Sequence, residues 1–231
     1  LIAVAFFSTA HASTASGNET ETLIGLSLEE LLQVTVTSVS RKPQSLSTSA
    51  AAVFVISQND IQRSGARTLP DLLRMVPGLQ IAQIDASTWA VTARGSNAAF
   101  ANQLLILMAG RTLYAPLFSG VYWDAQDTAL DAIDRIEVIR GPGASLWGAN
   151  AVNGVINIIT KQERDTHGFK ASVADGTSTR IESTAQWGGA IGDAVDYRFF
   201  GKYFSRDGFA SKQAGTVYDD WKMSRIGGRL D

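Results

Sequence analysis

Hydrophobic and polar residues follow strand-like patterns around residues 133–160 of the chain. Between Ile133 and Ile139, apolar and charged residues alternate with a period near two, which predicts a half-buried strand. Residues 154–160 are β-branched and almost continuously apolar, which predicts a more deeply buried strand. Glycines and Pro142 separate the two runs, so we expect a tight, shaped connection between the strands.

Upstream of these strands the pattern changes between helical and extended stretches. Ser57 and Asp60 form a capping-box pair, which predicts a helix over 58–64 that ends at Gly65. Thr68 and Asp71 repeat this signal for a helix over 69–75. Further helical signals lie at 26–32 and 127–134, and predicted strands lie at 33–39, 50–56 (buried), 79–84, 88–95 and 104–108 (buried).

After residue 161 apolar residues alternate with charged ones along 169–173, 181–187 and 195–203, with aromatic residues near the ends of the runs. Strands of a transmembrane β-barrel need this pattern, with apolar side chains facing lipid and polar side chains facing inward. A water-soluble meander with one wet face has a similar alternation. Both interpretations stay open from these residues alone.

Composition excludes several classes of function. The 231 residues contain no cysteine and two distant histidines, so disulfides, thiolate metal sites and a histidine metal centre are not expected. A net charge of −2 without a basic stretch makes nucleic acid an unexpected partner. The glycine-rich connection lacks the Gly-Lys-Ser/Thr of a phosphate loop. We expect neither a catalytic site nor a cofactor.

The first residues have the features of a secretory signal. Residues 1–7 are apolar, and Ala10-His11-Ala12 is a small-x-small cleavage site. The apolar run is too short to span a bilayer. We expect the sequence to begin inside a signal peptide, and the other interpretation is an ordinary apolar strand. Residues 13–22 are polar and are expected to be disordered after cleavage.

Residues 140–158, from Arg-Gly-Pro-Gly to Asn-Gly-Val-Ile-Asn-Ile, resemble the signature of the plug domain of TonB-dependent outer-membrane receptors. Arg94-Gly95 matches another motif of that family. The family usually has Asp where this chain has Ala109, which puts a coupling to Arg111 in doubt. The motif residues that carry the resemblance are Arg94, Gly95, Arg140, Gly141, Pro142, Gly148, Asn153 and Gly154.

The resemblance implies an α+β plug domain followed by the first antiparallel strands of a transmembrane β-barrel. Transporters of this kind have about 22 strands around a plugged lumen, so we expect the chain to be an N-terminal part of a larger receptor. The expected organisation is a signal-peptide remnant (1–12), an N-terminal segment (13–40), the plug domain (41–163) and the start of the barrel (164–231).

The resemblance also implies uptake of a scarce large ligand, driven by the periplasmic TonB energy transducer. The transducer captures a short extended segment called the TonB box as an added strand. We assign the box to Val34, Thr35, Val36 and Thr37, although residues 34–39 equally suit an edge strand of the plug. Charged plug residues resemble ion-pair partners for the inner barrel wall, or simply keep a strand face soluble: Arg94, Arg135, Glu137 and Arg140.

Aromatic residues concentrate between residues 112 and 124. This pattern predicts either an outward-facing ligand platform or packing that fills the space between plug and wall. The candidate ligand-facing residues are Asn97, Phe100, Tyr114, Phe118, Tyr122 and Trp123.

The family most often takes up ferric siderophores, and haem, cobalamin and oligosaccharides are other ligands. The expected location is the outer membrane of a Gram-negative bacterium, with its lipid as a partner. A secreted soluble binding domain and a receptor that transports nothing are the alternative functions.

Overall fold

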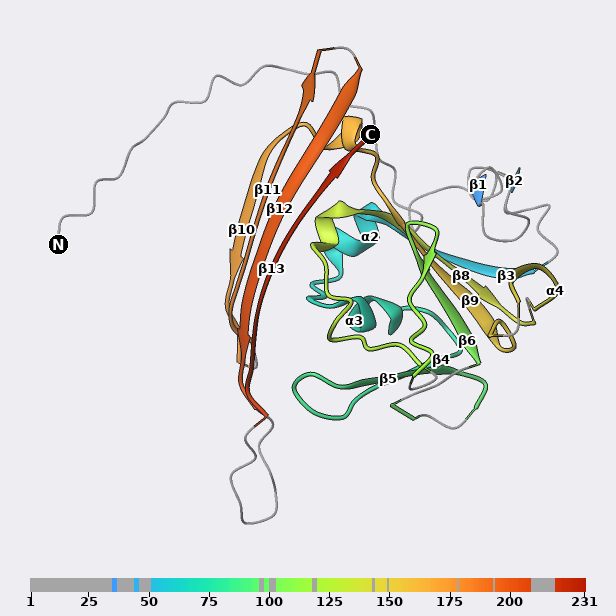
Figure 1. Ribbon diagram of the computed structural model, residues 1–231. Coiled ribbons are helices and arrows are strands. Elements are labelled where there is room, and N and C mark those ends of the chain that lie inside the picture. Colours follow the sequence, from blue (N-terminus) through green and yellow to red (C-terminus); the bar gives the residue numbers. More distant parts are fainter. Residues whose placement is uncertain are drawn as a thin grey trace.

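The computed structural model describes residues 35–36, 44–45, 51–95, 98–99, 103–117, 120–142, 144–148, 150–177, 179–192, 194–208 and 219–231. They form two bodies, shown side by side in Figure 1. Residues 51–160 make an α+β body, called here the plug unit. Strands β10–β13 make a curved antiparallel sheet, called here the wall sheet. This arrangement confirms the predicted α+β domain followed by antiparallel strands.

The plug unit is built on a five-stranded sheet in the order β3-β8-β9-β6-β7. Strand β6 runs parallel to β9, and the other neighbours are antiparallel. The strands are β3 (Ala52–Ser57), β6 (Leu104–Met108), β7 (Arg111–Thr112), β8 (Ile133–Arg140) and β9 (Gly154–Thr160).

Two strands of this sheet differ from the sequence prediction. The buried strand predicted at 50–56 is an edge strand, and Ile56 is its one fully buried side chain. The half-buried strand predicted at 133–139 is more deeply buried, because β8 lies between two neighbours. Even Glu137 on β8 is fully buried, and its carboxylate accepts a hydrogen bond from Arg135 Nε at 2.9 Å.

Helices α2 (Gln58–Arg63) and α3 (Leu69–Leu73) lie between the five-stranded sheet and the wall sheet (Figure 1). The predicted caps are present. Ser57 Oγ accepts from the Asp60 amide at 3.2 Å, and Thr68 Oγ1 accepts from the Asp71 amide at 3.2 Å. Gly65 follows α2 with φ +67°, a left-handed conformation that suits glycine.

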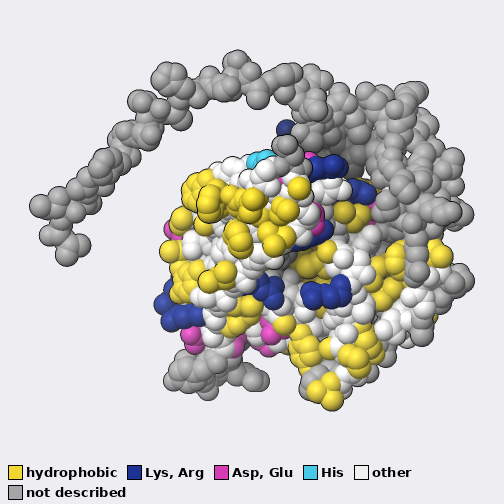
Figure 2. Space-filling view, turned by 45° about the horizontal axis from the view of Figure 1, so that its top comes forward, with side chains coloured by type: hydrophobic (Ala, Val, Ile, Leu, Met, Phe, Trp, Pro, Cys, Tyr) yellow, Lys and Arg dark blue, Asp and Glu magenta, His cyan; other side chains and the backbone are white. Residues whose placement is uncertain are grey.

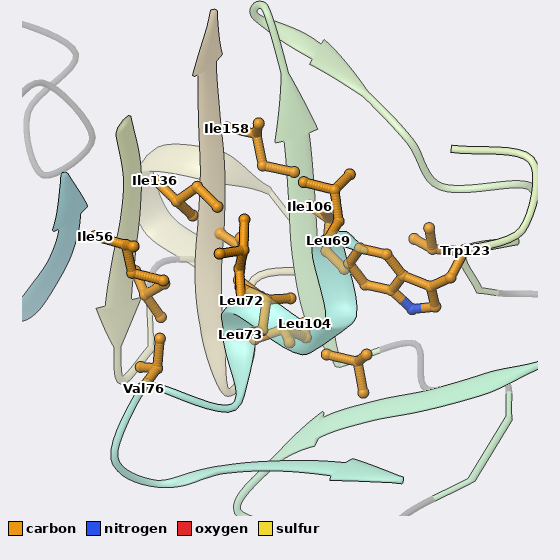
Figure 3. Packing of buried hydrophobic residues seen from close by; sticks show 14 of the residues in the cluster. Ile56, Leu69, Leu72, Leu73, Val76, Leu104, Ile106, Trp123, Ile136 and Ile158 are labelled. Atoms are coloured by element: carbon orange, nitrogen blue, oxygen red, sulfur yellow. The ribbon is translucent and has the colours of Figure 1, made fainter. Parts of the chain in front are cut away.

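The helices cover one face of the sheet and close the hydrophobic core of the plug unit. Leu69, Leu72 and Leu73 of α3 pack against Ile136, Ile158 and other sheet residues (Figure 3). Trp123 also enters this core, beside Leu69 and Ile106, and is 6% exposed. The core therefore draws on segments from residue 56 to residue 158, and it is complete before the wall sheet begins.

Smaller elements complete the plug unit. Strands β4 (Leu79–Gln83) and β5 (Trp89–Ala93) form a separate antiparallel hairpin. A turn at Ala109-Gly110, with φ +48° and +76°, joins β6 to β7. The helical lead-in predicted at 127–134 is a short 3-10 turn, η2 (Leu130–Ala132), and α4 (Ala144–Trp147) lies in the glycine-rich connection.

The wall sheet follows a 3-10 turn, η3 (Glu163–Thr166), and has the order β10-β11-β12-β13. Its strands are β10 (Gly168–Ala174), β11 (Thr179–Ile191), β12 (Val195–Arg206) and β13 (Trp221–Leu230). The first three contain the predicted alternating runs, and β13 lies beyond them in the sequence. Among the described residues, no helix is long and apolar enough to cross a membrane.

Burial in the wall sheet is the reverse of that in a soluble protein. Phe169 and Val173 are 70% and 74% exposed, whereas Lys202 and Arg198 are 4% exposed. Ion pairs and hydrogen bonds from Lys202 and Arg225 show that the charged face is turned toward the plug unit. Hydrophobic side chains gather on the outer surface over the wall sheet (Figure 2). This arrangement favours strands that face lipid over the soluble meander, because water would select the opposite orientation.

Candidate functional site

The glycine-rich motif has a structural role at the end of the five-stranded sheet. Gly141 and Gly148 have positive φ angles of +134° and +94°, which L side chains rarely adopt. At Gly154, a Cβ atom would collide with the carbonyl oxygen of Ile139 on the neighbouring strand β8. Arg140 Nη1 donates to the Pro77 carbonyl at 3.1 Å and joins the motif to the connection between α3 and β4, while Pro142 is exposed.

The two predicted plug motifs meet in space although they are distant in sequence. Asn153 Nδ2 donates to Gln103 Oε1 at 2.8 Å, and the Asn153 amide donates to the Gln103 carbonyl at 2.8 Å. Gly95 packs against the side chains of Asn153 and Gln103: a Cβ atom at this position would lie 3.9 Å from Asn153 Nδ2 and 3.9 Å from Gln103 Oε1. Arg94 precedes it with φ +54° and an exposed side chain. The motifs therefore fix one corner of the plug unit.

The aromatic candidates occupy different environments. Tyr114 and Tyr122 are half-buried and lie on either side of a turn closed by the hydrogen bond from the Ala115 amide to the Gly120 carbonyl at 2.8 Å. Trp123 is part of the plug core, where its indole packs inside the domain. Its place among the candidate ligand-facing residues is therefore corrected. Asn97, Phe100 and Phe118 lie outside the described residues.

The segment assigned to the transducer is partly described. Strand β1 (Thr35–Val36) pairs antiparallel with β2 (Gln44–Ser45), with Val36 opposite Gln44. Val36 is fully buried. Its backbone is therefore already engaged by a strand of the same chain. Val34 and Thr37 lie outside the described residues, as do the predicted signal peptide and the helix at 26–32.

One contact between the plug unit and the wall sheet is made by residues 125–128, called here the docking segment. Lys202 Nζ on β12 lies 3.0 Å from Asp127 Oδ2 and 3.5 Å from Glu182 Oε2 on β11. It also approaches the Thr128 carbonyl at 3.5 Å. Arg225 on β13 donates to the carbonyls of Ala125 and Asp127. Two cations of the wall sheet thus hold one segment of the plug unit.

The second meeting point is the linker η3 between the plug unit and the wall sheet. Glu163 is fully buried, and its carboxylate lies 3.1 Å from Arg198 Nη2 and 3.4 Å from Arg229 Nε. Burial raises the pKa of Glu163, and the neighbouring Asp231 carboxylate adds to this shift, whereas Arg198 and Arg229 act in the opposite direction. His167 Nε2 lies 2.6 Å from Asp196 Oδ1 and extends the contact.

The ion pairs between plug unit and wall sheet that the structure describes do not involve the plug residues that the sequence suggested for this role. Arg135 contacts Asp134 and Glu137, and Arg140 contacts Pro77, so their described partners belong to the plug unit itself. The wall-sheet members, Glu182, Arg198 and Lys202, lie on the inward face that the alternation predicts. Asp127 and Glu163 have no sequence signal of their own, because only the docking of the two bodies gives them partners.

The described residues contain no group of three or more His, Asp or Glu side chains placed to hold a metal ion. The charged groups at the interface are instead arranged as opposite pairs, with each carboxylate facing a cation. Such an arrangement suits the attachment of one body to another, because a buried charge is tolerated only when an opposite charge faces it.

A family model described as TonB-dependent receptor plug domain matches residues 45–155. The vitamin B12 transporter BtuB of Vibrio cholerae serotype O1 is 35% identical over 163 residues, which cover 70% of this chain and 26% of the relative. BtuB of Vibrio vulnificus is 30% identical over 183 residues, covering 78% of this chain and 29% of the relative. The chain thus spans little more than a quarter of the length of these curated relatives.

Two solved structures are similar in fold to this chain. The ferric-catecholate import receptor Fiu of E. coli K12, in its open form, aligns with a TM-score of 0.55 and 28% identity over 72% of this chain and 22% of its own. The ferric yersiniabactin uptake receptor FyuA of Yersinia pestis aligns with a TM-score of 0.61 over 84% of this chain and 30% of its own. At 21% identity, the second likeness shows the fold alone.

Proposed function

We propose a transport function on the premise that this chain belongs to the TonB-dependent receptors, whose plug domain its residues 45–155 match. Members of this family are transporters and receptors of the Gram-negative outer membrane. The protein binds a scarce ligand that is too large for porins, and the TonB transducer drives its passage through the barrel. We propose a ferric siderophore as the ligand.

The observation that carries this proposal is the reversed burial of the wall sheet together with the plug unit docked on its charged face. An apolar exterior gives the sheet a lipid-facing side. A polar interior gives it a surface on which a folded, water-soluble plug can rest and move. A secreted soluble domain, the alternative function, gains nothing from exposed Phe169, Trp187 and Phe199.

A corrinoid is a second candidate ligand, supported by the vitamin B12 transporters that are 30–35% identical to the chain. The ferric siderophore is supported by Fiu, which is 28% identical. Both ligands are large metal chelates. Tyr114 and Tyr122, which are both half-buried, remain proposed contacts for either ligand.

The proposed transducer segment is Val34 to Thr37. In the docked state Val36 pairs with Gln44, so capture by the transducer requires this short pairing to open. Two ladder residues are a weak barrier compared with a full strand. The transducer then replaces β2 as the partner of the same backbone groups, which is the chemistry of strand addition.

Uptake by cells tests the proposal. The full-length protein is expressed in a host without its own iron-chelate and corrinoid receptors, and entry of radioactive ferric siderophores and cyanocobalamin is measured. We expect one ligand class to enter in a manner that depends on the transducer. Val36→Pro should abolish uptake because proline lacks the N–H that strand addition needs, whereas Val36→Thr should retain it.

Binding of either ligand without entry would support a receptor that transports nothing, and it would overturn the transport proposal. Undiminished uptake by the Val36→Pro variant would remove Val36 from the proposed transducer segment. Fractionation of the full-length protein with soluble proteins would contradict the lipid-facing role of the wall sheet.

A further inference from the structure

We propose that two of the contacts between plug unit and wall sheet are unequal: the docking segment is releasable, whereas the linker at Glu163 is a fixed anchor. The inference rests on the proposed transport function only in that a plug has to move for a ligand to pass. It follows from the number of carboxylates that pair with Lys202 and with Arg198, and from the body to which each carboxylate belongs.

Lys202 has one carboxylate partner on each body. Asp127, at 3.0 Å, belongs to the plug unit, and Glu182, at 3.5 Å, belongs to the wall sheet. Glu182 lies on β11, opposite Phe204 in the register, and Lys202 lies opposite Thr184. The two residues are therefore diagonal neighbours on the inward face, and they stay together wherever the plug unit goes.

This second partner lowers the free-energy cost of undocking. A buried ammonium that loses its only carboxylate is strongly destabilised, since neither water nor a counter-charge replaces it. When Asp127 leaves, Lys202 keeps Glu182. A cavity of about 300 Å³ adjoins the pair and is lined by Ala129, Asp131, Glu182 and Lys202, among others. It gives the ammonium room to turn and gives water access to the released Asp127.

Arg198 has no comparable second partner. Within the part of the chain that the structure describes, Glu163 is the one carboxylate within ion-pair distance of its guanidinium. Both side chains are buried, at 5% and 0% exposure. The linker backbone also lies directly on β11, because a Cβ atom at Gly188 would collide with the Thr166 carbonyl oxygen. Moving this linker would leave a buried guanidinium unpaired.

The unequal contacts give plug movement a direction. Rearrangement begins at the docking segment, residues 125–128, where Lys202 changes from two carboxylates to one, and it leaves residues 163–166 in place. Glu182 accordingly acts as a positioning residue, which holds Lys202 during release. The plug unit swings or unfolds about the linker and does not leave as a free body.

Thiol labelling tests the order of release, because the 231 residues contain no cysteine. Ala129→Cys and Thr166→Cys place a thiol at positions that are 4% and 5% exposed, one beside the docking segment and one in the linker. Maleimide labelling of the full-length protein in detergent is followed as urea rises, with the labelling of the parent protein subtracted. We expect the Ala129→Cys variant to react at lower urea.

Substitutions then test the role of Glu182. In the Ala129→Cys background, Glu182→Gln should slow labelling about tenfold, because undocking would leave Lys202 without a carboxylate. Asp127→Asn should accelerate it, and Glu182→Asp is the control that keeps the charge and the original rate. The double variant Asp127→Asn with Glu182→Gln should be as fast as Asp127→Asn alone. In the Thr166→Cys background only Glu163→Gln should accelerate labelling.

Faster or unchanged labelling with Glu182→Gln overturns the proposal, as does earlier labelling of the Thr166→Cys variant. If Glu182→Gln does not fold, Asp127→Asn provides the test. The proposal then requires that Asp127→Asn accelerates labelling of the Ala129→Cys variant and does not accelerate labelling of the Thr166→Cys variant. No ligand or transducer is present in these measurements. Failed uptake in cells therefore overturns the transport function alone, and failed labelling predictions overturn the unequal contacts alone.

Discussion

Glu163 in the linker and Arg198 in β12 form a buried ion pair, with 3.1 Å between Oε1 and Nη2. The pair joins the last turn before the wall sheet to the inward face of that sheet. Because both groups are removed from water, the pair is sensitive to the loss of either partner. The same two residues lie 35 positions apart in a sequence that gives no sign of their contact.

Removing the cation from this pair should destabilise the protein. Arg198→Met leaves the Glu163 carboxylate buried with only the half-exposed Arg229 nearby, and we expect the free energy of unfolding to fall by about 3 kcal/mol. Denaturant unfolding of the full-length protein measures the change. Arg164→Gln, at an exposed position of the same linker, is the control and should change the stability by less than about 0.5 kcal/mol. Equal effects of the two variants would contradict the buried pair.

Ala109 is strained by its position in the turn between β6 and β7. Its φ of +48° costs an L residue about 1–2 kcal/mol compared with glycine. Ala109→Gly should therefore stabilise the protein by about 0.5–1 kcal/mol, after the greater flexibility of the unfolded chain is subtracted. Ala52→Gly, in the extended strand β3, should destabilise it. Thermal unfolding of both variants checks the opposite signs, and a loss of stability in Ala109→Gly would exclude strain at this turn.

Asp85 makes the end of the β4–β5 hairpin dependent on pH. Burial raises the pKa of Asp85, but hydrogen bonds from Ser87 and Thr88 outweigh it and lower the pKa below the ordinary value. The amide nitrogens of Ser87 and Thr88 lie 2.8 and 2.7 Å from Asp85 Oδ1. A lowered pKa means that the ionised carboxylate stabilises the fold above about pH 4 and that this contribution is lost as the pH falls further.

Hydrogen exchange of the Ile84 amide, which donates to the Thr88 carbonyl at 2.9 Å, reports this loss. We expect its protection to decrease as the pH is lowered from 5 toward 3, after correction for the intrinsic exchange rate. Asp85→Asn should remove the pH dependence. Protection that falls equally in both proteins would show that another group is responsible.

The half-buried tyrosines and the buried Trp123 are expected to affect different properties, ligand affinity and stability. Tyr114→Ala and Tyr122→Ala should each weaken ligand binding about tenfold, if these half-buried rings contact the ligand. Trp123→Phe should leave affinity unchanged, because Trp123 packs in the core, and should instead lower stability through imperfect packing. Equilibrium binding and unfolding of the same three variants distinguish the roles. An affinity loss confined to Trp123→Phe would reverse the assignment.

Local signals in the sequence were sufficient for much of the fold. Capping pairs at Ser57 and Thr68 predicted both helix starts, since each cap involves residues only three positions apart. The resemblance of residues 140–158 to a family signature predicted the plug domain, and the glycines of this run predicted a tight connection between two strands. The alternation after residue 161 predicted strands with one charged and one apolar face.

Tertiary structure decided which face is buried and which charges meet. Alternation is the same for a lipid-facing strand and for a soluble one, so the docked plug unit was needed to choose between them and to show which partners Lys202 and Arg198 have. Asp127, Glu163 and Glu182 acquired their partners from contacts between residues 35 to 75 positions apart or on neighbouring strands. Trp123, predicted either to face a ligand or to fill the space between plug and wall, lies in the plug core. Burial of an indole depends on the packing around it, which no local pattern encodes.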